Sequence, residues 1–326
     1  MNVAEAPAAM SLAAAPAVAE AAHRLDYTNP AYASQEVDER RWSIQSWFER
    51  TAWKTLHGTK YGRPADEACP SPHLWDDPLL RQIYLLDIAS FITAERTSML
   101  AVSGMVGLAP DEATQVHLST QVMDEARHYE VFCRRLADFG IKPAQREQLE
   151  RQVTTRAMRN FYDLIHEQVD KRDFIGASLA QNITMEGMAY PIYRYEIKYW
   201  SRFDPSLSRI IRGAFADEAH HVGFGEAVVR TQLQRLSVEK RNQMVALLHD
   251  MQGLMTEVFE QVIKHYIGLY QEAANNHMDL IGDLEIFPGQ TMATLSEEQQ
   301  ARQLLKEIKT EQAARLNHIG VNFAVE

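Results

Sequence analysis

The stretch DEARH at residues 124–128 recurs in closely related form as DEAHH at residues 217–221. Each copy holds a glutamate and a histidine three positions apart, Glu125 with His128 and Glu218 with His221. On an α-helix, residues i and i+3 lie on the same face, so each pair can reach one metal ion. One such pair arises often on a solvated helix face. Two of them, each preceded by an aspartate, indicate one site shared between two helices.

A further glutamate lies about one helix upstream of each pair. Glu95 precedes Glu125 by 30 positions, and Glu186 precedes Glu218 by 32 positions. Both lie among apolar neighbours, where an unpaired carboxylate is costly to bury unless a cation compensates it. Four carboxylates and two imidazoles on four helices are the ligand set of a carboxylate-bridged di-iron or di-manganese centre in a ferritin-like bundle. Oxygen and imidazole donors without thiolate also argue against zinc and iron–sulfur clusters.

The rest of the chain reads as long helices separated by short breaks, and the alternation typical of strands is scarce. Capping residues at Asp111, Ser237 and Ser296 predict the starts of three helices, and Pro191 predicts a kink inside another. The predicted helices span residues 35–57, 77–106, 111–139, 143–171, 174–200, 205–236, 237 to beyond 270, and 296–318, with a loop over 280–293. The sequence therefore predicts an all-α fold, a ferritin-like bundle of long helices with extra flanking helices.

We expect three segments along the 326-residue chain. Residues 1–30 read as a flexible tail rich in alanine and proline, residues 31–292 as the helical di-iron domain, and residues 293–326 as a C-terminal helix packed on or beside the bundle. Two cysteines exclude a disulfide scaffold and fit a reducing cytoplasm. A formal net charge of -11 argues against nucleic acid as a partner. No apolar run approaches the ~20 residues of a membrane-spanning helix, so we expect a cytoplasmic protein without a membrane partner.

Both motifs resemble the paired Asp-Glu-x-Arg-His motifs in the hydroxylase subunits of bacterial multicomponent monooxygenases, over roughly residues 77–236. More distantly, the chain resembles arylamine N-oxygenases in size and ligand order, although those enzymes carry a histidine where this chain has Ala214. The resemblance implies one iron bound by Glu95, Glu125 and His128 and a second bound by Glu186, Glu218 and His221, with Glu125 and Glu218 as the bridging, catalytic carboxylates.

The resemblance also implies roles for residues beside the ligands. Asp124 and Asp217 are each expected to accept the free N–H of the ligand histidine on the facing helix, which would fix the tautomer of that imidazole. Arg127 is expected in the same network. His220 stands where the monooxygenases usually carry arginine, and it either replaces that arginine or is an ordinary helix residue.

An apolar cavity beside the metals is the expected place for an oxidisable substrate. Six side chains fall near the ligand face and together would line it: Phe91, Met99, Phe132, Ile183, Tyr190 and Phe215. Taken singly, each is better explained by core packing. The cavity is therefore a prediction about the group and not about any one member.

The resulting hypothesis is an O₂-activating, non-haem di-iron oxygenase that hydroxylates or N-oxygenates a small, partly apolar organic substrate. Its cofactor would be two iron ions, or manganese or a mixed Mn/Fe pair, with O₂ as co-substrate. An electron-donor protein or reductase would be its partner, and we expect a homodimer. The alternative is a ferritin-like di-metal protein that is no oxygenase, either a ferroxidase or a radical-generating subunit like that of ribonucleotide reductase.

Overall fold

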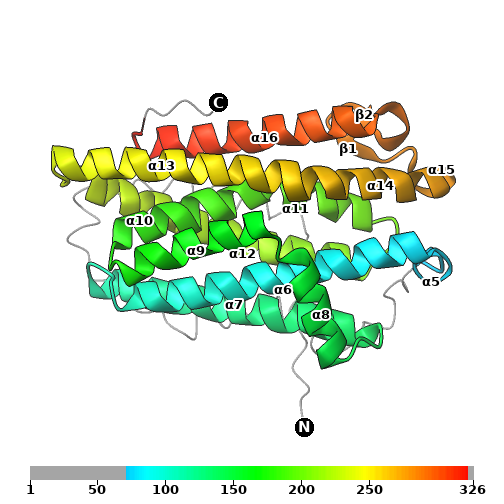
Figure 1. Cartoon of the computed structure of the whole chain (residues 1–326), viewed down its shortest axis with the longest axis horizontal. Coiled ribbons are helices and arrows are strands. Elements are labelled where there is room, and N and C mark those ends of the chain that lie inside the picture. Colours follow the sequence, from blue (N-terminus) through cyan, green and yellow to red (C-terminus); the bar gives the residue numbers. More distant parts are fainter. Residues whose placement is uncertain (1–70, 322–326) are drawn as a thin grey trace, which may run out of the picture.

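The computed structural model describes residues 71–321, and its long helices run roughly side by side (Figure 1). In chain order the elements are α5 (His73–Asp76), α6 (Pro78–Val106), α7 (Glu112–Asp138), α8 (Pro143–Val153), α9 (Arg156–Asp170), α10 (Phe174–Ser178), the π-helix η3 (Leu179–Met185), α11 (Glu186–Trp200), α12 (Pro205–Leu233), α13 (Val238–Val258), the π-helix η4 (Phe259–Ile263), α14 (Lys264–Asn276), α15 (Met278–Ile281), β1 (Glu285–Phe287), β2 (Gln290–Thr291), the 3₁₀ helix η5 (Met292–Thr294) and α16 (Glu297–His318). The predicted all-α bundle is confirmed. The predicted tail over residues 1–30 and the predicted helix over 35–57 lie outside the described residues.

Side-chain caps fix where several of the helices begin. The predicted caps Asp111, Ser237 and Ser296 each accept a hydrogen bond from the backbone N–H three residues on, at 2.8, 3.2 and 3.3 Å. Asp77 caps α6 in the same way, through two backbone N–H groups at 2.8 and 3.1 Å. These bonds satisfy donors that the first turn of a helix otherwise leaves unpaired. None of the helices between residues 71 and 321 combines the length and apolar character that a bilayer-crossing segment requires.

The prediction of one helix over residues 143–171 is wrong, because α8 and α9 are separate helices. Two threonines lie between them. The hydroxyl of Thr154 donates to the carbonyl of Glu150 at 2.6 Å, and the hydroxyl of Thr155 accepts from the amide of Met158 at 3.3 Å. Threonine hydroxyls offer the backbone an alternative to the helical ladder, so one helix ends and the next is capped at this point. As a result, α8 runs across the direction of the long helices (Figure 1).

The segment over residues 174–200 departs from α-helical geometry before Glu186, and the kink expected at Pro191 stays a prediction. Pro191 lies inside the continuous helix α11. The departure is the π-helix η3, in which the N–H of Glu186 donates to the carbonyl of Gln181, five residues earlier. Single π turns inside α-helices occur frequently at functional sites. Here the π turn ends at Glu186, one of the six predicted metal ligands.

The predicted loop over residues 280–293 contains regular structure that the sequence did not indicate. Strands β1 and β2 pair antiparallel and are the only strands among the described residues. Gly289, in the turn between them, has φ of +71°, a conformation that side chains other than glycine rarely adopt.

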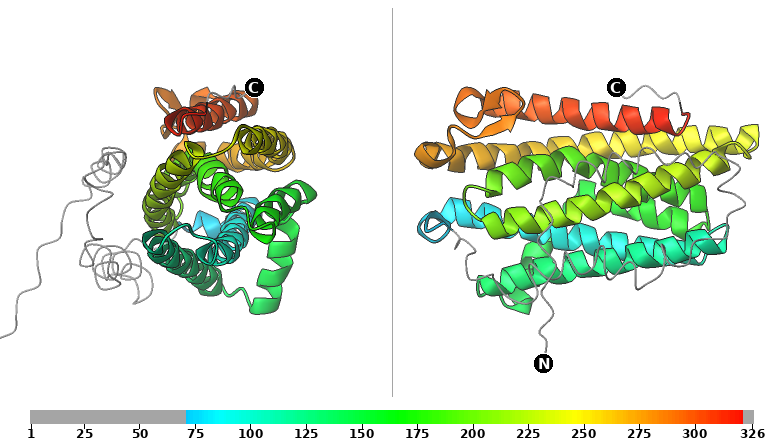
Figure 2. Two further views of the ribbon diagram at one scale, coloured as in Figure 1. Left: turned by 90° about the vertical axis from the view of Figure 1, so that its left-hand side faces the viewer. Right: turned by 180° about the vertical axis from the view of Figure 1, so that it is seen from behind.

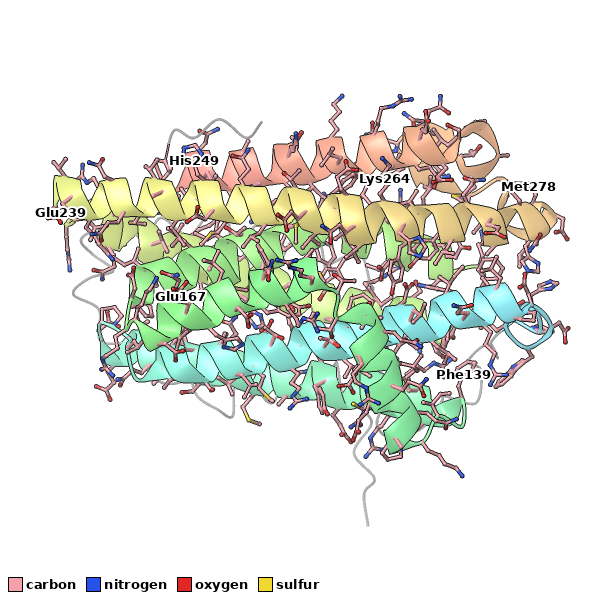
Figure 3. All side chains as sticks on the ribbon, in the orientation of Figure 1. Phe139, Glu167, Glu239, His249, Lys264 and Met278 are labelled. Atoms are coloured by element: carbon pink, nitrogen blue, oxygen red, sulfur yellow. The ribbon has the colours of Figure 1, made fainter. Side chains whose placement is uncertain are left out.

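The long helices form two adjacent pairs, α6 with α7 and α11 with α12, and α7 also packs against α12. Helix α16 lies along α11 and α14 on the outside of the bundle, as both views in Figure 2 show. The rod of α13, η4 and α14 extends along the molecule between Glu239 and Met278, and side chains fill the spaces between the rod and its neighbours (Figure 3). The faces of these four helices that meet inside the bundle carry the two motifs, on α7 and α12, and the two upstream glutamates, on α6 and α11.

A buried ion pair joins three of these helices. Arg135 on α7 is hydrogen-bonded to Asp204, the N-cap of α12, and its Nε donates to the hydroxyl of Tyr84 on α6 at 2.8 Å. Tyr84 in turn donates to Asp204. Asp204 is 0% exposed and Arg135 is 3% exposed, so removal of Arg135 would leave the carboxylate of Asp204 buried without a cation.

We predict that Arg135→Met lowers the free energy of unfolding by about 3–5 kcal/mol, the usual cost of removing one partner from a buried pair. The neighbouring Arg134→Met is the matched control. Arg134 pairs with Glu130 on the surface, where half of its side chain is exposed, and such pairs contribute about 0–1 kcal/mol. Urea unfolding of both variants measures the difference, and equal losses would show that the pair is not a structural tie.

Candidate metal centre

The six residues selected from the two motifs and their upstream glutamates meet inside the bundle. They come from α6 (Glu95), α7 (Glu125 and His128), the first residue of α11 (Glu186) and α12 (Glu218 and His221), and each is 3% exposed or less. Their ligand atoms form two groups, Glu95, Glu125, His128 and Glu218, and Glu125, Glu186, Glu218 and His221, with all atoms of a group within 4.8 Å of one another. Glu125 and Glu218 belong to both groups.

Two aspartates hold the histidines from behind. Nε2 of His128 lies 3.0 Å from Asp217 Oδ2, and Nε2 of His221 lies 3.2 Å from Asp124 Oδ2. Each aspartate therefore reaches the ligand histidine of the other motif. Arg127 lies between the aspartates, hydrogen-bonded to Asp124 and, at 3.1 Å, to Asp217. Because Nε2 of each ring is held by a carboxylate, Nδ1 is the nitrogen left facing the glutamates.

Burial sets the protonation of the glutamates. It raises the pKa of Glu95 to about 7 and that of Glu218 to about 8, and it raises the pKa of Glu186 well above the ordinary value. Repulsion between the carboxylates adds to this effect. Burial also opposes ionisation of Glu125, but its interactions with His128 and His221 outweigh it and hold that pKa well below its usual range. The cluster therefore retains protons near neutral pH.

The donor set fits two divalent cations. Six carboxyl groups, counting the two aspartates, face three groups that can carry positive charge, namely Arg127, His128 and His221. Fully ionised, the cluster would keep three negative charges in an apolar interior, which is strongly unfavourable. Two divalent ions bound to neutral imidazoles would reduce that excess to one. The buried Oε2 of Glu125 accepts no hydrogen bond, which leaves its lone pairs free for a cation.

Three amide side chains around Glu186 were not selected from the sequence. Nε2 of Gln121 donates to Glu186 Oε1 at 2.8 Å, and Nε2 of Gln181 donates to the same oxygen at 3.0 Å. Nδ2 of Asn182 lies 3.4 Å from Glu186 Oε2 and 3.0 Å from Gln121 Oε1. Gln121 lies four residues before Glu125, so helical spacing could have identified it. Gln181 lies five residues before Glu186, and only the π turn brings it to the same side.

His220 lies on the outer side of the cluster. Its side chain is exposed, because it is one position from His221 and therefore rotated by about 100° around the helix. Its ring packs edge-on against that of His117 at a centroid distance of 4.9 Å, and His117 is stacked on Phe224 at 3.6 Å. The position of His220 thus differs from that of Arg127, which lies between the two aspartates.

The predicted cavity residues surround Glu95 mainly as packed rings. Phe91 is stacked on Phe132 at 4.6 Å and on Tyr193 at 5.5 Å, and Tyr193 is stacked on Phe215 at 5.6 Å. The hydroxyl of Tyr193 lies 3.4 Å from Glu95 Oε1. Tyr193 was not selected from the sequence, although its position seven residues after Glu186 is on the same helix face.

The other three predicted cavity residues have different surroundings. Ile183 is fully buried in the main core, whereas Met99 is only partly buried. The hydroxyl of Tyr190 donates to the backbone carbonyl of Glu218 at 3.1 Å. The guanidinium of Arg315, on α16, lies 4.1 Å from the centroid of the Tyr190 ring. Helix α16 therefore reaches the wall of the cluster.

Comparison with known proteins relates this fold to di-metal oxidases. No protein-family model matches the sequence, and no curated protein matches it. Among solved structures, a point variant of an R2-like ligand-binding oxidase with an anaerobically reconstituted Mn/Fe cofactor matches with a TM-score of 0.56 and 18% identity, covering 87% of this chain and 98% of that chain. The same type of oxidase with an aerobically reconstituted Mn/Fe cofactor matches with a TM-score of 0.54 and 18% identity, covering 81% and 92%.

A protein from Synechococcus with aldehyde deformylating oxidase activity also matches, with a TM-score of 0.50 and 16% identity, covering 71% of this chain and 97% of that chain. At such identities the likeness defines the fold. The chain has a ferritin-like helical bundle similar to that of these oxidases, and it carries a buried cluster of carboxylates and histidines that could bind two metal ions.

We predict that metal binding tightens as pH rises from about 6 to 8.5. The metal-free site holds protons on Glu95, Glu218 and Glu186 because burial raises their pKa values, and facing carboxylates raise the pKa of His128 and His221 despite burial. Cations must displace these protons, so affinity should gain up to about tenfold per pH unit for each proton displaced.

The same linkage applies to stability. Groups whose pKa is raised by folding stabilise the metal-free protein at low pH, and this contribution is lost as pH rises through the folded-state pKa values. The melting temperature of the Mn²⁺-loaded protein should therefore exceed that of the EDTA-treated protein by an amount that grows from pH 6 to pH 8.5. Calorimetry at several pH values measures the gap, and a constant or shrinking gap would contradict the protonation scheme.

We also predict that Asp124→Asn and Asp217→Asn each weaken metal affinity by about 10–100-fold without eliminating the site, because each aspartate orients one histidine. Equilibrium dialysis against Mn²⁺ measures the affinity. Asp138→Asn on α7 is the control, since Asp138 lies near the surface and contacts Arg135 at 3.3 Å. Wild-type affinity in both test variants would show that the aspartates do not act on the metal site.

Proposed function

We propose that the protein is an O₂-activating di-metal oxygenase that hydroxylates or N-oxygenates a small, partly apolar organic substrate. The observation that carries the proposal is the buried cluster of four glutamates and two histidines, with two glutamates common to both ligand groups. The fold shared with oxidases that hold Mn/Fe cofactors supports it.

The two metal ions, as iron or as a mixed Mn/Fe pair, would bind O₂ and pass electrons to it. In the proposed reaction, one oxygen atom enters the substrate and the other leaves as water, which requires two electrons and two protons from an external donor. An electron-donor protein or reductase is therefore a necessary partner. We further propose a cytoplasmic protein that acts as a homodimer.

The residues of the chain contribute orientation, charge balance and exclusion of water. Glu125 and Glu218 are the proposed bridging ligands, because each reaches both groups. Asp124 and Asp217 hold the histidines through Nε2. The ring of Phe91 is stacked on the rings of Phe132 and Tyr193. These rings exclude water beside Glu95, which strengthens electrostatic interactions at that position.

A radical-generating protein is the second candidate, and one contact favours it. The phenol of Tyr193 lies 3.4 Å from Glu95 Oε1 in the interior, close enough for a proton to pass to the carboxylate when an electron leaves the ring. If the protein generates a radical, Tyr193 is the group that is oxidised, and no added organic substrate is needed.

Isotope labelling distinguishes these functions. Iron-loaded protein, supplied with a chemical reductant and ¹⁸O₂, would be incubated with toluene or aniline as probe substrates. An oxygenase gives a product that carries ¹⁸O and is about 2 mass units heavier than the product from ¹⁶O₂. Glu218→Ala should abolish both product formation and oxygen uptake. Its circular dichroism spectrum should remain helical, because packing supports the helices.

Glu130→Ala is the control, since it also replaces a glutamate on a helix that carries ligands, α7, but half of the Glu130 side chain is exposed. It should retain wild-type product formation. A long-lived tyrosyl signal in electron paramagnetic resonance without labelled product would favour the radical-generating protein. Iron oxidation with neither product nor radical would indicate a ferroxidase.

A further inference from the structure

The cluster has two halves, one made of Glu95, Glu125 and His128 and the other of Glu186, Glu218 and His221. The ligands have the same order and similar spacing in both halves, but the side chains around them differ. Position −4 relative to the upstream glutamate is Phe91 in one half and Asn182 in the other. Position −4 relative to the motif glutamate is Ala214 in the half that contains Glu218 and Gln121 in the half that contains Glu125. All four residues are buried, so the difference lies inside the site and not at the surface.

Both polar members of this comparison act on the same carboxylate. Gln121 donates to Glu186 Oε1, and Asn182 lies near Glu186 Oε2 while also donating to Gln121. Gln181 adds a second donor on Oε1, and the hydroxyl of Ser98 lies 2.9 Å from the amide nitrogen of Gln181. The amide donors therefore form a connected set around Glu186.

Glu95, the counterpart of Glu186, has no such set. Glu95 is hydrogen-bonded to the hydroxyl of Tyr193 at 3.4 Å and to Nδ1 of His128 at 3.2 Å. Phe91 occupies the place that Asn182 has in the other half, and its ring is stacked on Phe132. One upstream glutamate is therefore held by amides on the helices, whereas the other lies among aromatic rings.

Backbone geometry determines where the amides around Glu186 lie. The π turn of η3 places Gln181 and Glu186, five residues apart, above one another through the hydrogen bond between their backbone groups. Gly225 on α12 allows the close approach of Asn182, because a Cβ at that position would lie 2.5 Å from the Cβ of Asn182. The amides are thus held by the packing of helices and not by surface loops.

We propose that Gln121, Gln181 and Asn182 are positioning residues that fix Glu186 before any metal arrives, so that the two halves of the cluster fill in separate steps, the half with Glu186 and His221 first. A ligand that is already oriented loses less conformational freedom on binding than one that must be ordered. Two N–H donors occupy Glu186 Oε1, which leaves Oε2 as the oxygen with more free lone pairs. The inference rests on the proposed di-metal function but concerns binding and not turnover.

Stepwise titration of the metal-free, full-length protein with Mn²⁺ tests this inference, with free Mn²⁺ followed by electron paramagnetic resonance. The wild type should bind two ions with affinities at least about tenfold apart. Gln121→Leu should weaken the tighter step by about 10–100-fold and the weaker step far less, as expected when the support of one ligand is lost. Gln121→Asn, which withdraws the amide by one methylene group, should give a smaller loss in the same step.

Two further variants assign the steps. His221→Ala should remove the tighter step and His128→Ala the weaker one. Gln168→Leu is the matched control, because Gln168 is a buried glutamine on α9 whose amide donates to the carbonyl of Leu164. It should leave both steps unchanged.

The outcomes separate the two levels of the proposal. Two ions bound with equal affinity, or equal weakening of both steps by Gln121→Leu, would overturn the positioning role and leave the proposed function standing. Removal of the tighter step by His128→Ala would also overturn it. A wild-type protein that binds no Mn²⁺ and no Fe²⁺ would overturn the proposed function together with this inference.

Discussion

The cost of burying four glutamates side by side is the constraint on which the arrangement of the site depends. Packing alone cannot remove this cost, so the surrounding side chains must offset it. The crossed contacts of Asp124 with His221 and of Asp217 with His128, with Arg127 between the aspartates, link α7 to α12 by charge. The same contacts orient the imidazoles toward the glutamates. Structural stability and the capacity to bind cations therefore arise from one set of interactions.

The two halves of the cluster repeat the ligand residues but not the side chains that surround those ligands. Carboxylate and histidine positions correspond in the two halves, but Asn182 and Gln121 correspond to Phe91 and Ala214. A symmetric ligand set thus lies between a polar wall and an aromatic wall. An apolar substrate would meet less desolvation cost on the aromatic side, since no amide there has to give up a hydrogen bond.

The sequence was sufficient for features that depend on local spacing. The Glu-x-x-His pairs, the upstream glutamates and caps such as Asp111 all follow from helical periodicity, and the structure brings the six residues together. It was insufficient where periodicity changes or where contacts are distant in sequence. Gln181 is reached only through the π turn. Arg315 contacts the Tyr190 ring from a helix more than 100 residues further along the chain, a contact that no spacing rule contains.

The π turn also has a consequence for how the gene can change. A hydrogen bond from residue i to i+5 accommodates one residue more than the α-helical bond does. Deleting a single codon between residues 182 and 186 would restore the α-helix and bring Gln181 one position nearer to the glutamate along the helix. Gln181 and Asn182 would then point elsewhere, although no ligand had been altered. Around the turn at Gly289, by contrast, a change of length is confined to a surface hairpin. A single-residue deletion should therefore disturb the metal site when it falls in the π turn, whereas the hairpin around Gly289 should tolerate it.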